Sequence, residues 1–99
     1  ALYRTNMDGS IENGYTLRLI NKSEAAQAFT VHLVDAPRGI ALAADPGRVE
    51  VGAGEVRSVG VALKAPAGAV RGRVDVAIEV RSADGDTAVR EETRFFGPF

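Results

Sequence analysis

Hydrophobic and polar residues alternate along much of this chain with a period of two, which is the pattern of β-strands that bury one face and expose the other. In residues 15–21, Tyr15, Leu17 and Leu19 share one face, and the residues between them are polar. The dipeptide Asn-Gly at residues 13–14 favours a turn. We therefore expect an inner strand over residues 15–21, bounded by turns at both ends.

The same alternation recurs along the rest of the chain, interrupted by glycine, proline and aspartate at turn positions. It predicts an edge strand over residues 1–5, strands over residues 28–35, 40–43, 48–51 and 56–63, and a C-terminal hairpin of residues 73–81 and 87–96. Gly60 falls within a predicted strand, where glycine is typical of a bulge or a close backbone approach. In the hairpin, Arg90, Glu92 and Arg94 share an exposed face, so opposite charges are expected to meet across the pair.

Seven or eight short strands, with turn signals every eight to twelve residues or so, are typical of an all-β protein. We predict an immunoglobulin-like Greek-key β-sandwich of seven to eight strands, with a β-barrel as the alternative. Antibody domains fix their core with two cysteines and a tryptophan, and this chain has neither residue type. The core is therefore expected to consist of aliphatic side chains together with Tyr15, Phe29 and Phe95.

The composition limits the number of domains and the class of partner. A chain of 99 residues with 45% hydrophobic and 25% charged residues has the length and composition of a single folded domain. Its net charge of -1 leaves no basic stripe for phosphate contacts, which argues against a nucleic-acid partner. Without cysteine the chain forms neither a disulfide nor a thiolate metal site. It also lacks a signal peptide pattern and any apolar run near the roughly 20 residues of a membrane span.

No residue of this chain is predicted to carry catalysis or to bind a metal or a cofactor. His32, the single histidine, has the exposed parity of its strand and no partner at a workable spacing, so we interpret it as a surface histidine. Turn positions account for the aspartates that could suggest a calcium site, which are Asp8, Asp45, Asp84 and Asp86. The glycine loops lack phosphate-binding patterns, and no nucleophile, base and orienting residue can be grouped. We therefore predict that the domain is not an enzyme.

The C-terminal tail offers the best candidate for contact with a partner. Three phenylalanines lie within residues 95–99, more than one small core readily absorbs. Phe95 is expected in the core. Phe96 and Phe99 are the candidate partner contacts, and the competing interpretation is that they pack along an edge of the sandwich.

Several segments of the sequence resemble one known family. They are Leu2-Tyr3-Arg4, Asp8 to Asn13, Tyr15 to Ser23, Val51 to Val56, Lys64-Ala65-Pro66 and Phe95 to Pro98. In wording and spacing they are similar to the C-terminal domain of the FixG/CcoG/RdxA family of cytochrome oxidase accessory proteins, over nearly the whole chain. The Ile-Glu-Asn-x-Tyr-Thr-Leu segment is the most specific part, and Gly14 departs from the larger residue expected at its variable position.

The resemblance implies an immunoglobulin-like domain that follows the last transmembrane helix of a bacterial inner-membrane protein and faces the periplasm. The chain begins at Ala1, and we expect it to be a fragment from the C-terminus of such a protein. The parent resembles a ferredoxin-like protein with cysteine-ligated iron-sulfur clusters, and its family acts in assembly of the cbb-type oxidase and in copper handling. Since no cysteine lies in residues 1–99, the resemblance implies a cofactor-free accessory domain that contacts oxidase assembly components or the rest of its parent.

Two other functions are weighed against this protein-contact role. A sandwich that binds a carbohydrate or another small ligand requires a concave site with aromatics on one sheet, whereas most aromatics of this chain have core parity. Metal delivery by the domain itself requires sulfur or imidazole ligands, which only Met7 and His32 could supply. Both alternatives therefore rank below the protein-contact role.

Overall fold

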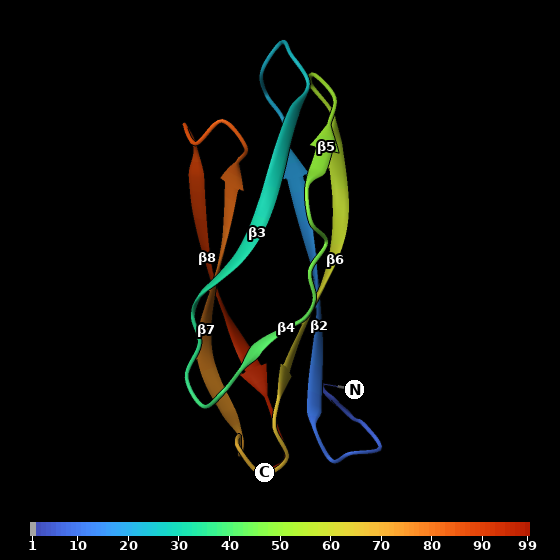
Figure 1. The fold of residues 1–99 in the computed structure, drawn as a ribbon, viewed down its shortest axis with the longest axis vertical. Helices are drawn as coiled ribbons and strands as arrows, with labels where there is room; N and C mark the ends of the chain where they lie inside the picture. Colours follow the sequence, from blue (N-terminus) through green and yellow to red (C-terminus); the bar gives the residue numbers. More distant parts are fainter. Residues whose placement is uncertain (1) are drawn as a thin grey trace.

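The computed structural model describes residues 2–99, which form two antiparallel sheets of four strands each. The strands are β1 (Arg4–Thr5), β2 (Ile11–Ile20), β3 (Gln27–Asp35), β4 (Ala41–Ala44), β5 (Val49–Val51), β6 (Val56–Ala65), β7 (Arg73–Ser82) and β8 (Ala88–Phe96). The first sheet has the order β1-β2-β6-β4 and the second β5-β3-β7-β8, so the pairs β2–β6 and β3–β7 are formed by long connections, as in a Greek key. Figure 1 shows the result, an elongated sandwich measuring 46 × 21 × 17 Å. The predicted all-β sandwich is confirmed.

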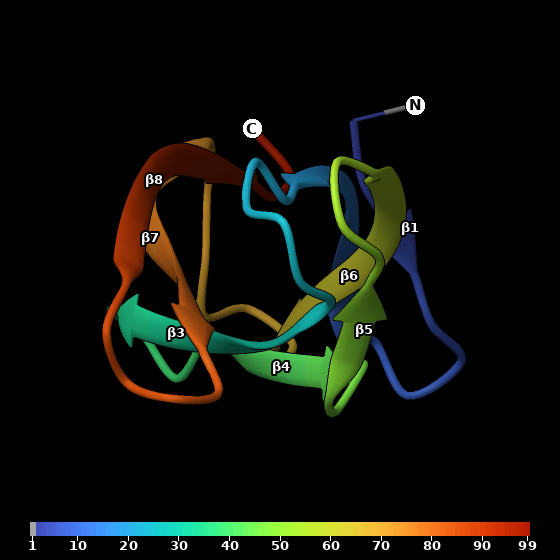
Figure 2. The same ribbon diagram turned by 90° about the horizontal axis from the view of Figure 1, so that it is seen from above.

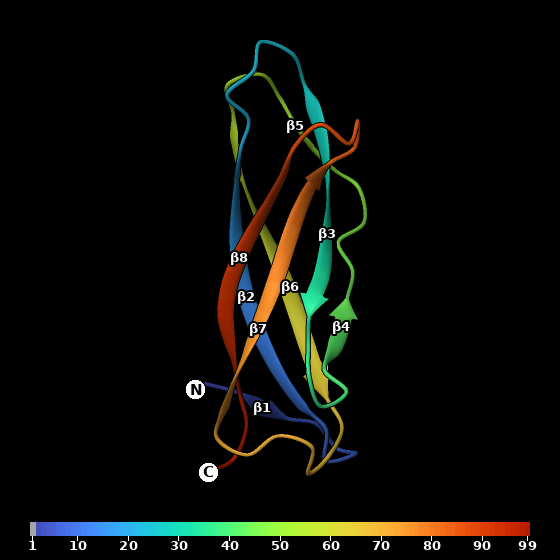
Figure 3. The same cartoon turned by 90° about the vertical axis from the view of Figure 1, so that its left-hand side faces the viewer.

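The strands β3 to β8 begin and end within two residues of the predicted ones. The predicted N-terminal strand is reduced to Arg4–Thr5, and its first residue, Ala1, lies outside the described residues. β1 and the C-terminus of the chain lie at the same end of the long axis, as Figures 1 and 3 show. The pattern of alternation therefore located the strands, but it did not set the length of the first one.

The predicted turn at Asn13-Gly14 is wrong, because both residues lie in the β2–β6 ladder and β2 starts at Ile11. Asn13 is only 3% exposed. Its side-chain amide bonds to the backbone of β8, which compensates for the low strand propensity of asparagine. A buried polar residue in the middle of a strand thus resembled a turn in the sequence.

Gly60 marks neither a bulge nor a close backbone approach, contrary to the prediction. It lies opposite Thr16 in a regular register, and a Cβ atom at Gly60 would have no heavy atom within 4 Å. The register shifts instead occur between Leu33 and Asp35 in β3, and at the end of β4. The irregular positions therefore lie at the C-terminal ends of β3 and β4, where bulges bend the strands.

The core lies between the two sheets and is built from the inward-facing side chains of the long strands. Phe95 and Leu63 are 0% exposed, as expected for the centre of such a sandwich. Tyr15 and Phe29 are half-buried and pack against the core clusters. The predicted aromatic contribution to the core is therefore complete for Phe95 and partial for the other two residues.

One long side of the sandwich is open between β2 and β8, which lie side by side in Figure 3. β1 pairs only with the first residues of β2, and β8 is the outer strand of its sheet. Near β1, side chains of β2 connect the two sheets: Asn13 Nδ2 donates to Phe96 O and the Phe96 amide to Asn13 Oδ1, both at 2.8 Å. The Tyr15 hydroxyl donates to Arg94 O at 2.9 Å. Figure 2, viewed along the long axis, shows both sheets end-on.

The Tyr15 hydroxyl gives a prediction for alkaline pH. Burial raises the pKa of Tyr15 from 10.0 to about 12, because desolvation disfavours the phenolate. The folded state then holds the proton more tightly than the unfolded state, so stability is complete below pH 10.0 and falls as the pH rises towards about 12. We expect urea titrations to show this fall for the natural chain and for Tyr3→Phe, but a smaller one for Tyr15→Phe. Equal alkaline losses in all three proteins would contradict the assignment.

Candidate interaction surface

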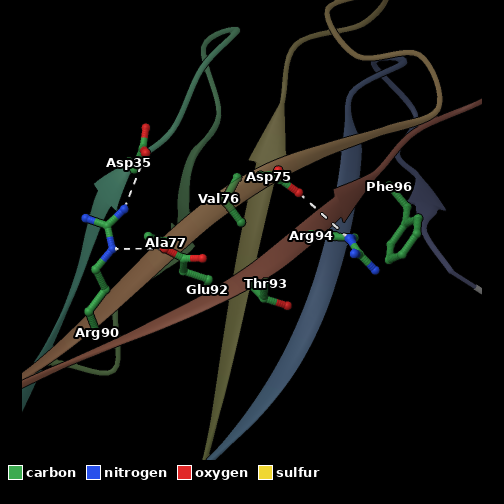
Figure 4. A pocket seen from close by; sticks show the side chains of 9 residues that line it. All are labelled: Asp35, Asp75, Val76, Ala77, Arg90, Glu92, Thr93, Arg94 and Phe96. Carbon is green, nitrogen blue, oxygen red and sulfur yellow. Dashed lines mark hydrogen bonds and ion pairs between the residues drawn. The ribbon is translucent and has the colours of Figure 1, made fainter.

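The predicted contact residue Phe96 lies at one end of a hollow on the outer face of β7 and β8 (Figure 4). The hollow has a volume of about 710 Å³. It is lined by Asp35, Asp75, Val76, Ala77, Arg90, Glu92, Thr93, Arg94 and Phe96. We call it the β7–β8 hollow. It combines charges of both signs with one aromatic ring.

The charged side chains of the β7–β8 hollow form exposed ion pairs. Arg90 lies 3.5 Å from Asp35 and 3.7 Å from Glu92, and Arg94 lies 3.8 Å from Asp75. The pair between Arg94 and Asp75 confirms that opposite charges meet across the hairpin. The approach of Asp35 was not predicted, because it comes from β3, on the far side of β7. Exposed pairs of this kind contribute at most about 1 kcal/mol each, so a partner's charges can replace them at little cost.

The second predicted contact residue, Phe99, lies at the same end of the molecule but outside the hollow. It is 84% exposed, and its ring lies next to Gly72. The tail that carries it is fixed, because the Gly97 amide donates to Gly72 O at 2.7 Å and the Gly72 amide donates to Pro98 O at 2.9 Å. Any side chain at position 97 would collide with Val70 O, since a Cβ there would be 2.5 Å from it. The backbone that carries Phe96 and Phe99 is therefore held in place by residues 70–72. The side chain of Phe96 is half-buried and that of Phe99 is exposed.

A second depression, of about 610 Å³, lies on the open side of the sandwich. Half of its lining residues are apolar, and they are Leu17, Leu19, Ile20, Phe29, Ile78, Val80 and Val89. Its other lining residues are Tyr15, Thr16, Arg18, Thr87, Glu91, Glu92 and Thr93. We call it the β2–β8 groove. The sequence could not reveal it, because it depends on which strand edges face each other.

Three aspartates of the predicted turns, Asp8, Asp45 and Asp84, accept turn hydrogen bonds as expected. Asp8 Oδ1 accepts hydrogen bonds from the Ser10 hydroxyl at 2.6 Å and from its amide at 2.9 Å, and these bonds hold the pKa of Asp8 below its usual value. Asp84 Oδ1 accepts hydrogen bonds from the Ser82 hydroxyl at 2.6 Å and from the Asp86 amide at 3.0 Å, and these bonds lower the pKa of Asp84. Within residues 2–99 no three histidine, aspartate or glutamate side chains are grouped so that they could hold a metal ion.

His32 is half-buried, and its Nε2 lies 2.8 Å from Thr30 Oγ1 on the same strand. The contact keeps the ring against the sheet on the side predicted to face solvent. Met7, the other candidate ligand for metal delivery, is fully exposed in the β1–β2 connection. The structure therefore does not bring Met7 and His32 together, since Met7 lies in a loop between two strands of the first sheet and His32 lies on β3 of the second.

Asn21 has a role that sequence reasoning missed. Asn21 directly follows β2, as expected of a strand end. It is nevertheless only 2% exposed. Its Nδ2 donates to the carbonyl oxygens of Ala25, Val51 and Gly52 at 2.8, 3.1 and 3.1 Å. Its Oδ1 accepts from the amide and the hydroxyl of Ser23 at 2.9 and 2.7 Å. Asn21 therefore joins the two loops at the end of the sandwich opposite β1.

The comparisons with known proteins agree with the fold. Residues 1–98 match the model of a family described as "IG-like fold at C-terminal of FixG, putative oxidoreductase". A FixG-related protein from Vibrio parahaemolyticus has a similar structure, with a TM-score of 0.79 and 21% identity over 92% of this chain and 83% of that one. SSP-19, an MSP-domain protein like family member from Caenorhabditis elegans, has a TM-score of 0.50 and 14% identity over 87% and 88% of the two chains. No curated protein sequence matches the chain.

These structural likenesses concern the fold alone, at identities of 21% and 14%. They place the chain among immunoglobulin-like and MSP-like sandwiches. In residues 2–99 no helix has the length and apolar character needed to cross a bilayer.

Proposed function

Since the chain belongs to the family of immunoglobulin-like domains at the C-terminus of FixG, we propose that it is a non-catalytic docking domain of a larger, membrane-anchored protein of this kind. The parent would carry iron-sulfur clusters in another part of its chain and would serve assembly of the cbb-type oxidase and copper handling. The domain would face the periplasm. Its task would be to contact a protein partner, either an oxidase assembly component or the rest of its own parent.

The observation that carries this proposal is the β7–β8 hollow. Arginine and aromatic residues are enriched at protein interfaces, and the hollow places Arg90 and Arg94 on the same face as Phe96. The side chains of both arginines are about half exposed, 48% and 56%. Their ion pairs are weak enough to be exchanged for contacts with a partner. Phe99, close to the same end, would extend the contact area.

A small-ligand or carbohydrate site is supported less well. Such a site would hold the ligand between aromatic faces in a mostly apolar concavity. The β7–β8 hollow contains one aromatic ring, Phe96, among charged side chains. The geometry therefore favours a protein surface over a small ligand as the occupant.

The test uses the full-length protein in cells that make the oxidase. We expect the double substitution Arg90→Ala and Arg94→Ala to reduce copurification of oxidase subunits with the tagged protein at least about fivefold, as for the loss of interface hot spots. The matched control, Arg48→Ala with Arg57→Ala, removes the same charge from β6 and the segment before β5 and should leave copurification unchanged. Equal copurification of both variants would contradict the role of the hollow. Failure of the natural protein to copurify any oxidase subunit would contradict the role in oxidase assembly.

A further inference from the structure

The β2–β8 groove leads to an inference that does not depend on the β7–β8 hollow. We propose that the polypeptide immediately before Ala1 in the full-length protein adds a strand to the free edge of β2 and covers this groove. The strand would run antiparallel to β2 along Thr16 to Ile20. It would fix the orientation of the domain relative to the part of the protein that precedes it.

The backbone of β2 presents the hydrogen-bonding groups that such a strand needs. The backbone amide of Asn21 donates to Glu55 O at 3.0 Å. In the regular antiparallel register of β2 and β6, every second residue of β2 pairs with β6 in this way, so Leu19 and Leu17 do as well. The amides and carbonyls of Thr16, Arg18 and Ile20 therefore point away from β6, towards the open side. No strand of residues 2–99 pairs with them there. An unpaired row of this kind is a template for an added strand.

The edge of β8 faces the same opening. The Ser82 amide donates to Thr87 O at 2.8 Å, so by the same alternation Ala88, Arg90 and Glu92 direct their backbone groups away from β7. The equivalent carbonyl of Arg94 accepts the hydrogen bond of the Tyr15 hydroxyl. The side chains of Asn13 and Tyr15 thus close the opening between β2 and β8 near β1. The opening remains beside Thr16 to Ile20.

The side chains around the groove suit the inner face of an added strand. Leu17, Phe29 and Val80 are only partly buried, although they pack against the core. Ile20 and Val89, on the two rims, are 54% and 52% exposed. A strand with apolar residues at alternate positions would remove the inward-facing groups among these, Leu17, Phe29, Val80 and Val89, from water.

The direction of β1 identifies the preceding polypeptide as the occupant. β1 is antiparallel to β2, with Arg4 opposite Glu12 and Thr5 opposite Ile11, so each step towards the N-terminus moves one residue along β2 towards the groove. β1 lies on the open edge of β2, as the order of the sheet requires, and Figure 3 shows its N-terminal end directed away from the long axis of β2. The preceding polypeptide would therefore turn once before it runs along Thr16 to Ile20. Leu2 is 59% exposed, and we place the interruption of the strand there, beside the Asn13 and Tyr15 bridges. The matching family lies at the C-terminus of FixG, so in such a protein further chain precedes this domain.

Glu91 makes a strand of a separate protein a less suitable occupant of the β2–β8 groove than the segment that precedes β1. It has the same inward parity as Phe95 and lines the groove from β8. A charge pointing inward at a sheet edge is a device that disfavours pairing with unrelated strands. A segment tethered to β1 has a high effective concentration and can tolerate this cost.

The test is hydrogen exchange of β2 amides in the purified full-length protein. The comparison protein has about eight residues before Ala1 replaced by glycine and serine, which is enough chain to pass Thr16 to Ile20. The quantity measured in each protein is the exchange rate of the Thr16, Arg18 and Ile20 amides divided by that of Leu17 and Leu19. The two leucine amides bond to β6 and therefore correct for any change in overall stability.

We expect this ratio to be at least about tenfold lower in the natural protein than in the comparison protein, as for the gain of one hydrogen bond per amide. Equal ratios in the two proteins would overturn the proposal. A low ratio that appears only at high protein concentration would also overturn it, because the occupant would then be a second copy.

Discussion

Replacing Phe95 by alanine is expected to lower the free energy of unfolding by about 3 to 5 kcal/mol, the usual cost of removing a buried phenylalanine. Phe95 is 0% exposed and is the largest of the fully buried side chains. It lies opposite Val74 in the β7–β8 ladder and belongs to the main core cluster, which contains residues of both sheets. Since domains of this size are stable by about 5 to 15 kcal/mol, the loss would remove between about a fifth and nearly all of the stability.

Urea titration followed by circular dichroism measures this effect. Phe99→Ala is the matched control, because it removes the same ring four residues later, where the side chain is 84% exposed. We expect the control to change the free energy of unfolding by no more than about 0.5 kcal/mol. Similar losses for the two variants would show that Phe95 does not occupy the centre of the core.

The second large effect is expected for Asn21→Ala, which should lower the free energy of unfolding by about 2 to 4 kcal/mol. The substitution removes a side chain that is 2% exposed and donates hydrogen bonds to the carbonyl oxygens of Ala25, Val51 and Gly52. The Val51 carbonyl lies in a buried position, where water does not readily replace the lost donor. The same urea titration measures the loss.

Asn21→Asp separates the donor from the acceptor role of this side chain. Aspartate keeps the shape and the oxygen that binds Ser23, but an ionised carboxylate cannot donate to carbonyl oxygens. We therefore expect Asn21→Asp to be at least as destabilising as Asn21→Ala. Lys22→Ala, at the exposed neighbouring position, should have little effect. Full stability of Asn21→Asp would mean that the three donated bonds contribute nothing.

The alternation of residue types was sufficient to predict most of the fold, because each long strand buries one face. The hairpin of β7 and β8 is the clearest case: Val76 and Ile78 are 2% and 1% exposed, as their parity requires. The pattern failed at Asn13, which resembles a turn residue, and it did not reveal the buried hydrogen bonds of Asn21, although the strand end there was predicted. Their partners lie far along the chain, and the Phe96 backbone is 83 residues away from Asn13. A buried amide with distant partners leaves no local signal in the sequence.

The candidate sites were predicted to different degrees for the same reason. Phe96 and Phe99 could be proposed from the excess of phenylalanine in the tail, and they remain predicted contacts. The charged face of β8 could also be predicted from its alternation. The contribution of Asp35 and the existence of the β2–β8 groove could not, because both depend on which strands become neighbours in the sheets.

The arrangement of the ends has a mechanical consequence. β1 and the C-terminus emerge together, while the connections after β2, β5 and β7 lie at the opposite pole (Figure 1). The long axis between the poles measures 46 Å. If the domain is held only through β1, a small rotation at β1 moves the loops at the opposite end of the long axis. Their displacement is several times larger than the displacement at β1.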